Sequence, residues 1–103
     1  MIETTKFGAL VSGEQPVLVD FFATWCGPCK ALAPILVDVA KQLDGAVRVV
    51  KMDVGQNPAI AQNYQVQGVP TLVLFSKGKI AWRQSGVLTA TAIVQHVRNH
   101  LST

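Results

Sequence analysis

The chain has two cysteines, Cys26 and Cys29, at the point where a strand-like apolar run passes into a helix-like run. On a helix, a separation of three residues places two side chains on one face, close enough for their sulfur atoms to bond. The start of a helix also carries partial positive charge and unpaired amides, which favour a thiolate over a thiol. The pair therefore predicts thiol–disulfide chemistry, with Cys26 as the exposed nucleophile and Cys29 as the deeper, resolving thiol.

Two other roles for the cysteines stay open, namely a pair of buried thiols or half of a zinc site. Zinc would need two more ligands, and the histidines available are His96 and His100, far along the chain. These two are four residues apart and lie off the buried stripe of the last predicted helix. We therefore expect both histidines to face solvent.

The elements around the cysteines follow from the hydrophobic pattern. Residues 17–22 are apolar on both alternating faces, which is typical of a central strand covered on both sides. Residues 28–43 carry apolar residues at helical spacing. Strands and helices alternate first, and a hairpin at Lys77-Gly78 follows, so the pattern predicts an α/β sheet of mixed direction. The remaining predicted helices start near residues 4, 57 and 89, and the remaining predicted strands cover 46–53, 71–75 and 80–84.

Length and composition limit the possible classes of protein. The 103 residues predict a single domain, 1–103, and a chain that is 50% hydrophobic and 15% charged can fold around a core. No apolar run approaches the roughly 18 residues that a membrane span needs. The first residues resemble no signal peptide, and two cysteines make no disulfide framework. We therefore expect a cytoplasmic location, or an equivalent reducing compartment such as the plastid stroma.

Charge is distributed unevenly along the chain. Residues 1–53 carry five basic and six acidic side chains, whereas residues 54–103 carry four basic side chains and no acid. This basic half is either an ordinary solvated face or a docking surface for acidic protein partners. Four scattered cations without interleaved aromatic residues do not indicate nucleic-acid binding.

Residues 25–30, Trp-Cys-Gly-Pro-Cys-Lys, resemble the active-site signature of the thioredoxin family. The similarity covers nearly the whole chain, and the further matching positions are Asp20, Pro34, Asp53, Val69-Pro70-Thr71 and Gly86. The resemblance implies the thioredoxin fold, a central mixed β-sheet of four to five strands flanked by helices on both faces. Because the N-terminal segment is short, we expect the usual first edge strand to be short or absent.

The resemblance also implies roles for two charged residues. Asp20 would be buried, which raises the proton affinity of a carboxylate, and it would act as general acid or base for Cys29. Lys51 resembles the lysine that approaches this carboxylate. From the sequence pattern alone, Asp20 could instead be a surface carboxylate and Lys51 an ordinary strand-edge lysine.

A substrate surface is implied as well. Pro70 resembles the cis-proline that faces the cysteines, and the backbone of Val69 would bind an extended substrate by strand addition. Trp25 and Gly86 would line the same flat apolar surface.

The Gly27-Pro28 spacer offers no side-chain donor to a thiolate. Oxidising members of the wider fold have a histidine between the cysteines, which stabilises the thiolate of the reduced form. Compared with them, this chain should favour the disulfide, so its dithiol is expected to be a reductant.

Together these features predict a protein-disulfide reductase, a carrier in electron transport that acts as a monomer on protein disulfides. No metal or bound organic cofactor is implied, nor any nucleic acid or membrane partner. A thioredoxin reductase, either a flavoprotein or a ferredoxin-linked enzyme, would restore the dithiol. Two alternatives stay open: a binding module that docks a partner regardless of redox state, and a metal or cluster site shared between two chains.

Five positions distinguish this chain within the resemblance. Phe22 stands where many members have a second tryptophan, and Thr24 where an acid is common. Gln67 and Ser85 lie near the expected substrate contacts. Trp82 is either an exposed docking residue or a half-buried packing residue.

Overall fold

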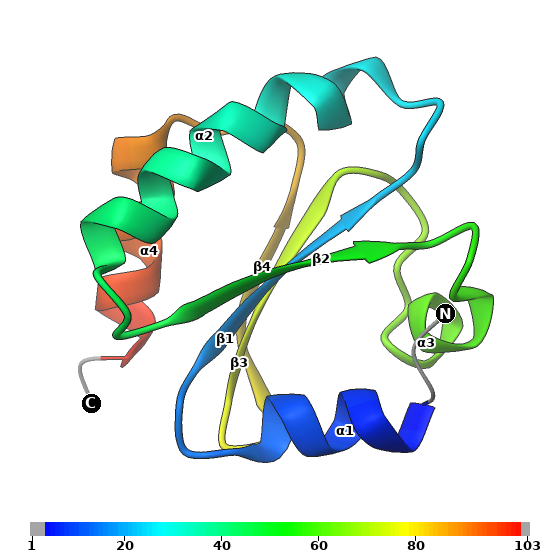
Figure 1. The fold of residues 1–103 in the computed structure, drawn as a ribbon, viewed down its shortest axis with the longest axis horizontal. Helices are drawn as coiled ribbons and strands as arrows, with labels where there is room; N and C mark the ends of the chain where they lie inside the picture. Colours follow the sequence, from blue (N-terminus) through cyan, green and yellow to red (C-terminus); the bar gives the residue numbers. More distant parts are fainter. Residues whose placement is uncertain (1–3, 102–103) are drawn as a thin grey trace.

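A four-stranded mixed sheet forms the centre of the computed structural model, which describes residues 4–101 (Figure 1). The strand order is β2-β1-β3-β4. β1 runs parallel to β2 and antiparallel to β3, and β4 is antiparallel to β3. The strands are β1 (Val17–Phe22), β2 (Arg48–Asp53), β3 (Thr71–Ser76) and β4 (Lys79–Ser85). The structure thus confirms the predicted α/β sheet of mixed direction.

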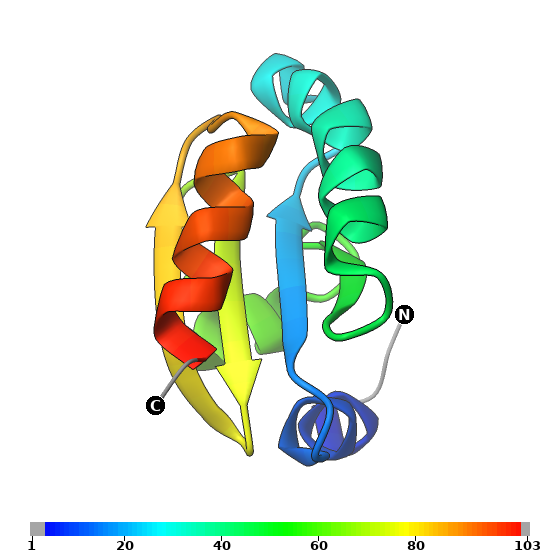
Figure 2. The ribbon, with the colours of Figure 1, turned by 90° about the vertical axis from the view of Figure 1, so that its left-hand side faces the viewer.

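Helices cover both faces of this sheet. They are α1 (Thr4–Ser12), α2 (Gly27–Leu43), α3 (Pro58–Asn63) and α4 (Ala90–Leu101). Helices α2 and α4 lie on one face, and α1 and α3 lie on the other (Figure 1). Figure 2 looks onto the first of these faces, where α4 covers the β3–β4 half of the sheet and α2 lies beside β1 and β2.

The central strand β1 separates two hydrophobic cores. Leu18 packs in the core beneath α2 and α4, whereas Val17, Val19 and Phe21 pack in the core beneath α1 and α3. All four side chains are buried. This alternation confirms that both faces of β1 are covered, as its continuous apolar run predicts.

The ends of the sheet differ slightly from the prediction. β2 begins at Arg48 rather than residue 46, because the Ala46 N–H still donates to the carbonyl of Leu43 at the end of α2 (2.9 Å). Among residues 4–16 there is a helix and no strand, so β2 forms one edge of the sheet. The β3–β4 hairpin turns as predicted, with φ of 54° at Lys77 and 82° at Gly78, the positive values that a two-residue hairpin needs.

Trp82 on β4 is 9% exposed and belongs to the core beneath α4, so the option of an exposed docking residue is wrong. The ring of His96 stacks on the Trp82 indole with a centroid distance of 4.9 Å and an interplanar angle of 13°. The expectation of two solvent-facing histidines is therefore wrong for half-buried His96, whereas His100 is exposed.

Candidate active site

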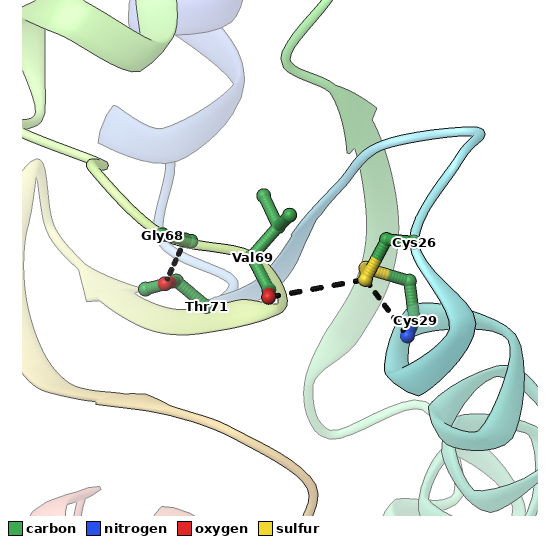
Figure 3. Close-up of a disulfide and its surroundings, with 5 residues drawn as sticks. All are labelled: Cys26, Cys29, Gly68, Val69 and Thr71. Atoms are coloured by element: carbon green, nitrogen blue, oxygen red, sulfur yellow. Dashed lines mark hydrogen bonds between the residues drawn. A yellow bond between two sulfur atoms is a disulfide. The ribbon is translucent and has the colours of Figure 1, made fainter.

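The cysteine pair lies at the N-terminus of α2 and is joined as a disulfide (Figure 3). Cys26 is the N-cap residue, with an extended backbone (φ −92°, ψ 114°), and its Sγ accepts a hydrogen bond from the Cys29 N–H at 3.1 Å. Pro28 occupies the first turn, where its missing N–H leaves no helical hydrogen bond unmade. The helix therefore directs a backbone N–H at the sulfur of Cys26, which favours negative charge on that atom.

The two cysteines are equally buried, each 4% exposed, so the expectation of an exposed Cys26 above a deeper Cys29 is wrong for the disulfide form. Cys26 packs in a small cluster with Ala23 and Cys29, against which Val54 and Val69 lie. Its Sγ is 3.8 Å from the Val69 carbonyl oxygen (Figure 3). The sulfur is therefore buried by its local neighbours together with a loop 43 residues further along the chain.

That loop, residues 68–70, is held in place from two sides. The Thr71 hydroxyl donates to the Gly68 carbonyl at 2.6 Å and lies 2.9 Å from the Ser85 hydroxyl. The Gly86 N–H donates to the Pro70 carbonyl at 2.9 Å. The Val69–Pro70 peptide bond is cis, as the resemblance implied. Gly86 has φ of 95°, a conformation that favours glycine.

Trp25 is 80% exposed beside the cysteines. Exposure on this scale is uncommon for so large an apolar side chain, which more often lies in the core. Val69 is half-buried on the facing loop, and Gln67 is exposed beside it. Trp25 therefore adds accessible apolar surface next to the disulfide. The Ser85 hydroxyl forms a hydrogen bond with the Thr71 hydroxyl.

Asp20 is fully buried in β1, and neither of its carboxylate oxygens has a hydrogen-bond partner among the described residues. Burial raises the pKa of Asp20 from 3.8 to about 6, and the positive charge of Lys51 offsets part of that rise. Lys51 is the partner of Asp20 in the β1–β2 register, and its Nζ lies 5.0 Å from the centre of the Phe22 ring. The expected burial of Asp20 is thus confirmed, and the direction of its pKa shift agrees with that burial.

A cavity of about 310 Å³ opens next to Cys29. Lys30 and Lys51 contribute its charged groups, and its other lining residues are Phe22, Ala23, Thr24 and Ala33. The positions of Phe22 and Thr24, singled out in the sequence, therefore shape the space beside the second cysteine. The cavity itself could not be found from sequence, because it forms between α2 and a strand that follows it.

Arg83 has a positioning role that the charge pattern did not reveal. Its guanidinium donates to the carbonyls of Tyr64 (2.7 Å) and Gln65 (3.1 Å), in the segment that leads to the loop at 68–70. Arg98 likewise donates to the Gln42 carbonyl at 3.4 Å. Two of the four cations in the basic half are therefore bound to backbone carbonyls.

Within residues 4–101, no three His, Cys, Asp or Glu side chains come together in a group that could hold a metal ion. None of the helices in this range is both long enough and apolar enough to cross a membrane.

Comparison with known proteins gives consistent matches. The thioredoxin family model matches residues 1–99. Thioredoxin-like protein slr0233 of Synechocystis is 47% identical over 94 residues, which cover 90% of each chain. Chloroplastic thioredoxin Y2 of Arabidopsis thaliana is 44% identical over 92 residues, 89% of this chain but 55% of that relative. The crystal structure of chloroplastic thioredoxin z superposes with a TM-score of 0.86 at 41% identity, covering 99% of this chain and 93% of that one.

The mixed sheet with helices on both faces, and a reactive cysteine pair capping the helix after β1, define a thioredoxin-fold thiol–disulfide oxidoreductase. The chain belongs to the thioredoxin family.

Proposed function

We propose that the chain reduces protein disulfides and that Cys26 makes the first attack. The observation that carries this assignment is the hydrogen bond from the Cys29 N–H to Cys26 Sγ at the start of α2. In the dithiol form the same N–H would stabilise a thiolate on Cys26. The Cys26 thiolate then attacks one sulfur of a substrate disulfide, a mixed disulfide forms, and the other substrate sulfur leaves as a thiolate.

Cys29 completes the reaction. Its thiolate attacks Cys26 Sγ, the mixed disulfide breaks, and the second substrate sulfur leaves while the Cys26–Cys29 bond forms. Two electrons pass from the dithiol to the substrate, and each substrate thiolate takes up one proton. Asp20, with a pKa raised to about 6, is the group we propose to accept the Cys29 proton, assisted by Lys51 on the neighbouring strand.

The substrate chain would lie across the loop at 68–70. The Val69 carbonyl already points at Cys26 Sγ, so a strand hydrogen-bonded to Val69 would bring its own sulfur to the same place. Pro70 and Gly86 hold this loop, and Trp25 provides exposed apolar surface beside it. The exposed Gly27-Pro28 turn would be the other wall of this substrate surface.

A separate thioredoxin reductase would restore the dithiol. One matched relative, of Mycobacterium leprae, is named bifunctional thioredoxin reductase/thioredoxin, and this chain is 42% identical to it over 93 residues that make up 20% of its length. A ferredoxin-linked reductase is the second candidate, and a reduction assay with each reductase supplied in turn distinguishes the two. We propose a monomeric single-domain carrier in electron transport, without a bound cofactor, in the cytoplasm or in a reducing compartment such as the stroma.

Trapping of the mixed disulfide tests the two cysteine roles. Cys29→Ser removes the resolving thiol, so it should accumulate covalent adducts with a model protein disulfide, detected on non-reducing gels and by mass spectrometry. Cys26→Ser is the matched control and should form no stable adducts. Stable adducts with Cys26→Ser would reverse the assignment, and retention of cellular function by a variant without either cysteine would favour the binding module instead.

A further inference from the structure

The outer edge of β2 has no neighbouring strand among the described residues (Figure 1). The Arg48 N–H donates to the Pro16 carbonyl and the Val54 N–H to the Phe22 carbonyl, both at 2.9 Å, and these bonds mark the two ends of the ladder to β1. Backbone groups alternate in direction along a strand, so the even-numbered residues of β2 face β1. The backbone groups that point to the open edge belong to Val49, Lys51 and Asp53.

Two polar groups of Asp53, its carbonyl and its side-chain carboxylate, already accept hydrogen bonds. Its carbonyl accepts from the Asn57 N–H at 3.0 Å, and its side-chain Oδ1 accepts from the N–H groups of Gly55 (2.8 Å) and Gln56 (3.3 Å). The open edge therefore offers the N–H and C=O groups of Val49 and Lys51 and the N–H of Asp53. This is the set that a short added strand would use.

A groove runs beside this edge, between β2 and α2. An apolar cavity of about 350 Å³ is lined by Val49 and Lys51 from β2 and by α2 residues including Val37, which is 58% exposed. The cavity of about 310 Å³ beside Cys29 continues it, because Ala33 and Lys51 line both. We call these two joined cavities the β2 groove.

The charged side chains that line the β2 groove are both basic. They are Lys30 and Lys51, and no Asp or Glu lines either cavity. The buried Asp20 carboxylate offsets part of the charge of Lys51, whereas Lys30 is exposed. The nearby Asp53 carboxylate is held by two backbone N–H groups. The groove is therefore complementary to an acidic segment.

We propose that the open edge of β2 and the β2 groove bind an extended acidic segment of a partner protein as a fifth strand. An apolar side chain of the segment fills the cavity beside Val49 and Val37. An acidic side chain two residues away, about 6.6 Å along a strand, reaches Lys51 and Lys30. A second copy of the chain fits less well, because its own edge strand would bring a second Lys51 to the same place as Lys51 and Lys30.

A cysteine-free peptide tests the surface apart from any thiol chemistry. The probe is acetyl-Thr-Val-Thr-Glu-Thr-Val-Thr-amide, titrated into the ¹⁵N-labelled disulfide form of the protein and followed by NMR. We expect saturable shifts and slowed hydrogen exchange at the Val49, Lys51 and Asp53 amides. Replacing the glutamate with lysine should weaken binding about tenfold. No saturable binding at millimolar peptide, equal binding of both peptides, or protection of other amides would overturn the proposal.

Charge reversal locates the site on the protein. Lys30→Glu should weaken binding of the acidic peptide up to about fivefold. Lys79→Glu makes the same charge change at an exposed position of β4, at the opposite edge of the sheet, and should leave binding within about twofold. Equal weakening by both variants would overturn the location. A dimer in sedimentation without peptide, with the same amides protected, would assign the edge to a second copy.

Discussion

At the scale of single residues, the buried Asp20 carboxylate lowers the stability of the fold. A buried carboxylate without hydrogen-bond partners is destabilising in its charged form, and such groups are rare in folded proteins. A shift of the Asp20 pKa from 3.8 to about 6 corresponds to a cost of up to about 3 kcal/mol when the carboxylate is ionised. A group retained at this cost is a reasonable candidate for the proton acceptor of the reaction.

Asp20→Asn should reveal this cost through its pH dependence. Well below pH 3.8 Asp20 is protonated in both the folded and unfolded states, so the variant and the parent should differ little in stability. As pH rises through the interval from 3.8 to about 6, the parent should lose up to about 3 kcal/mol relative to the variant, and the difference should then stay constant. Urea unfolding at about pH 3 and at pH 8 measures this difference. A difference independent of pH would show that Asp20 does not titrate in this way.

At the scale of elements, the start of α2 could be predicted from sequence and the burial of Cys26 could not. The signals for the helix are local: an apolar strand, a turn with proline, and apolar residues at helical spacing. Val69 contributes to the burial of Cys26, and the ring of His96 stacks on Trp82, and both contacts join different elements of the fold. Asp20 and Pro70 were placed correctly through the family resemblance rather than through their own local pattern.

The first turn of α2 should also set the redox balance of the pair. Pro28→His introduces a potential donor between the cysteines, and an imidazolium there would stabilise the Cys26 thiolate of the dithiol form. The reduction potential should therefore rise by tens of millivolts, since about 30 mV corresponds to 1.4 kcal/mol. Equilibration with glutathione redox buffers measures the potential, with Pro28→Ala as the control without a donor. An unchanged or lower potential in the histidine variant would contradict the assignment.

At the scale of the whole molecule, helices cover both faces of the sheet. The two tryptophans lie in different environments within this fold. Trp82 joins β4 to the core beneath α4, whereas Trp25 projects from the site. Trp82 is thus part of the packed core, whereas the role proposed for Trp25 is in substrate binding. The sequence offered no way to tell them apart except the motif around Trp25, because both could be core or surface by composition.

The same substitution at the two tryptophans should therefore have different effects. Trp82→Ala leaves a cavity beneath α4 and should destabilise the fold by about 3 to 5 kcal/mol. Trp25→Ala removes an exposed side chain and should change the free energy of unfolding by less than about 0.5 kcal/mol. Chemical denaturation followed by far-UV circular dichroism compares them without relying on tryptophan fluorescence. Equal losses at both positions would contradict the burial seen here.

The placement of both cysteines in one turn has a consequence for how the protein cycles. Their Cα atoms are 5.3 Å apart and three positions apart in sequence, at the N-terminus of one helix. Closing so short a ring constrains the unfolded chain far less than a long-range crosslink would. Folding and oxidation form a thermodynamic cycle. The free energy by which the disulfide stabilises the folded state therefore equals the free energy by which folding favours disulfide formation. One scaffold can therefore serve both oxidation states, and each turnover requires rearrangement at two sulfur atoms rather than refolding of a domain.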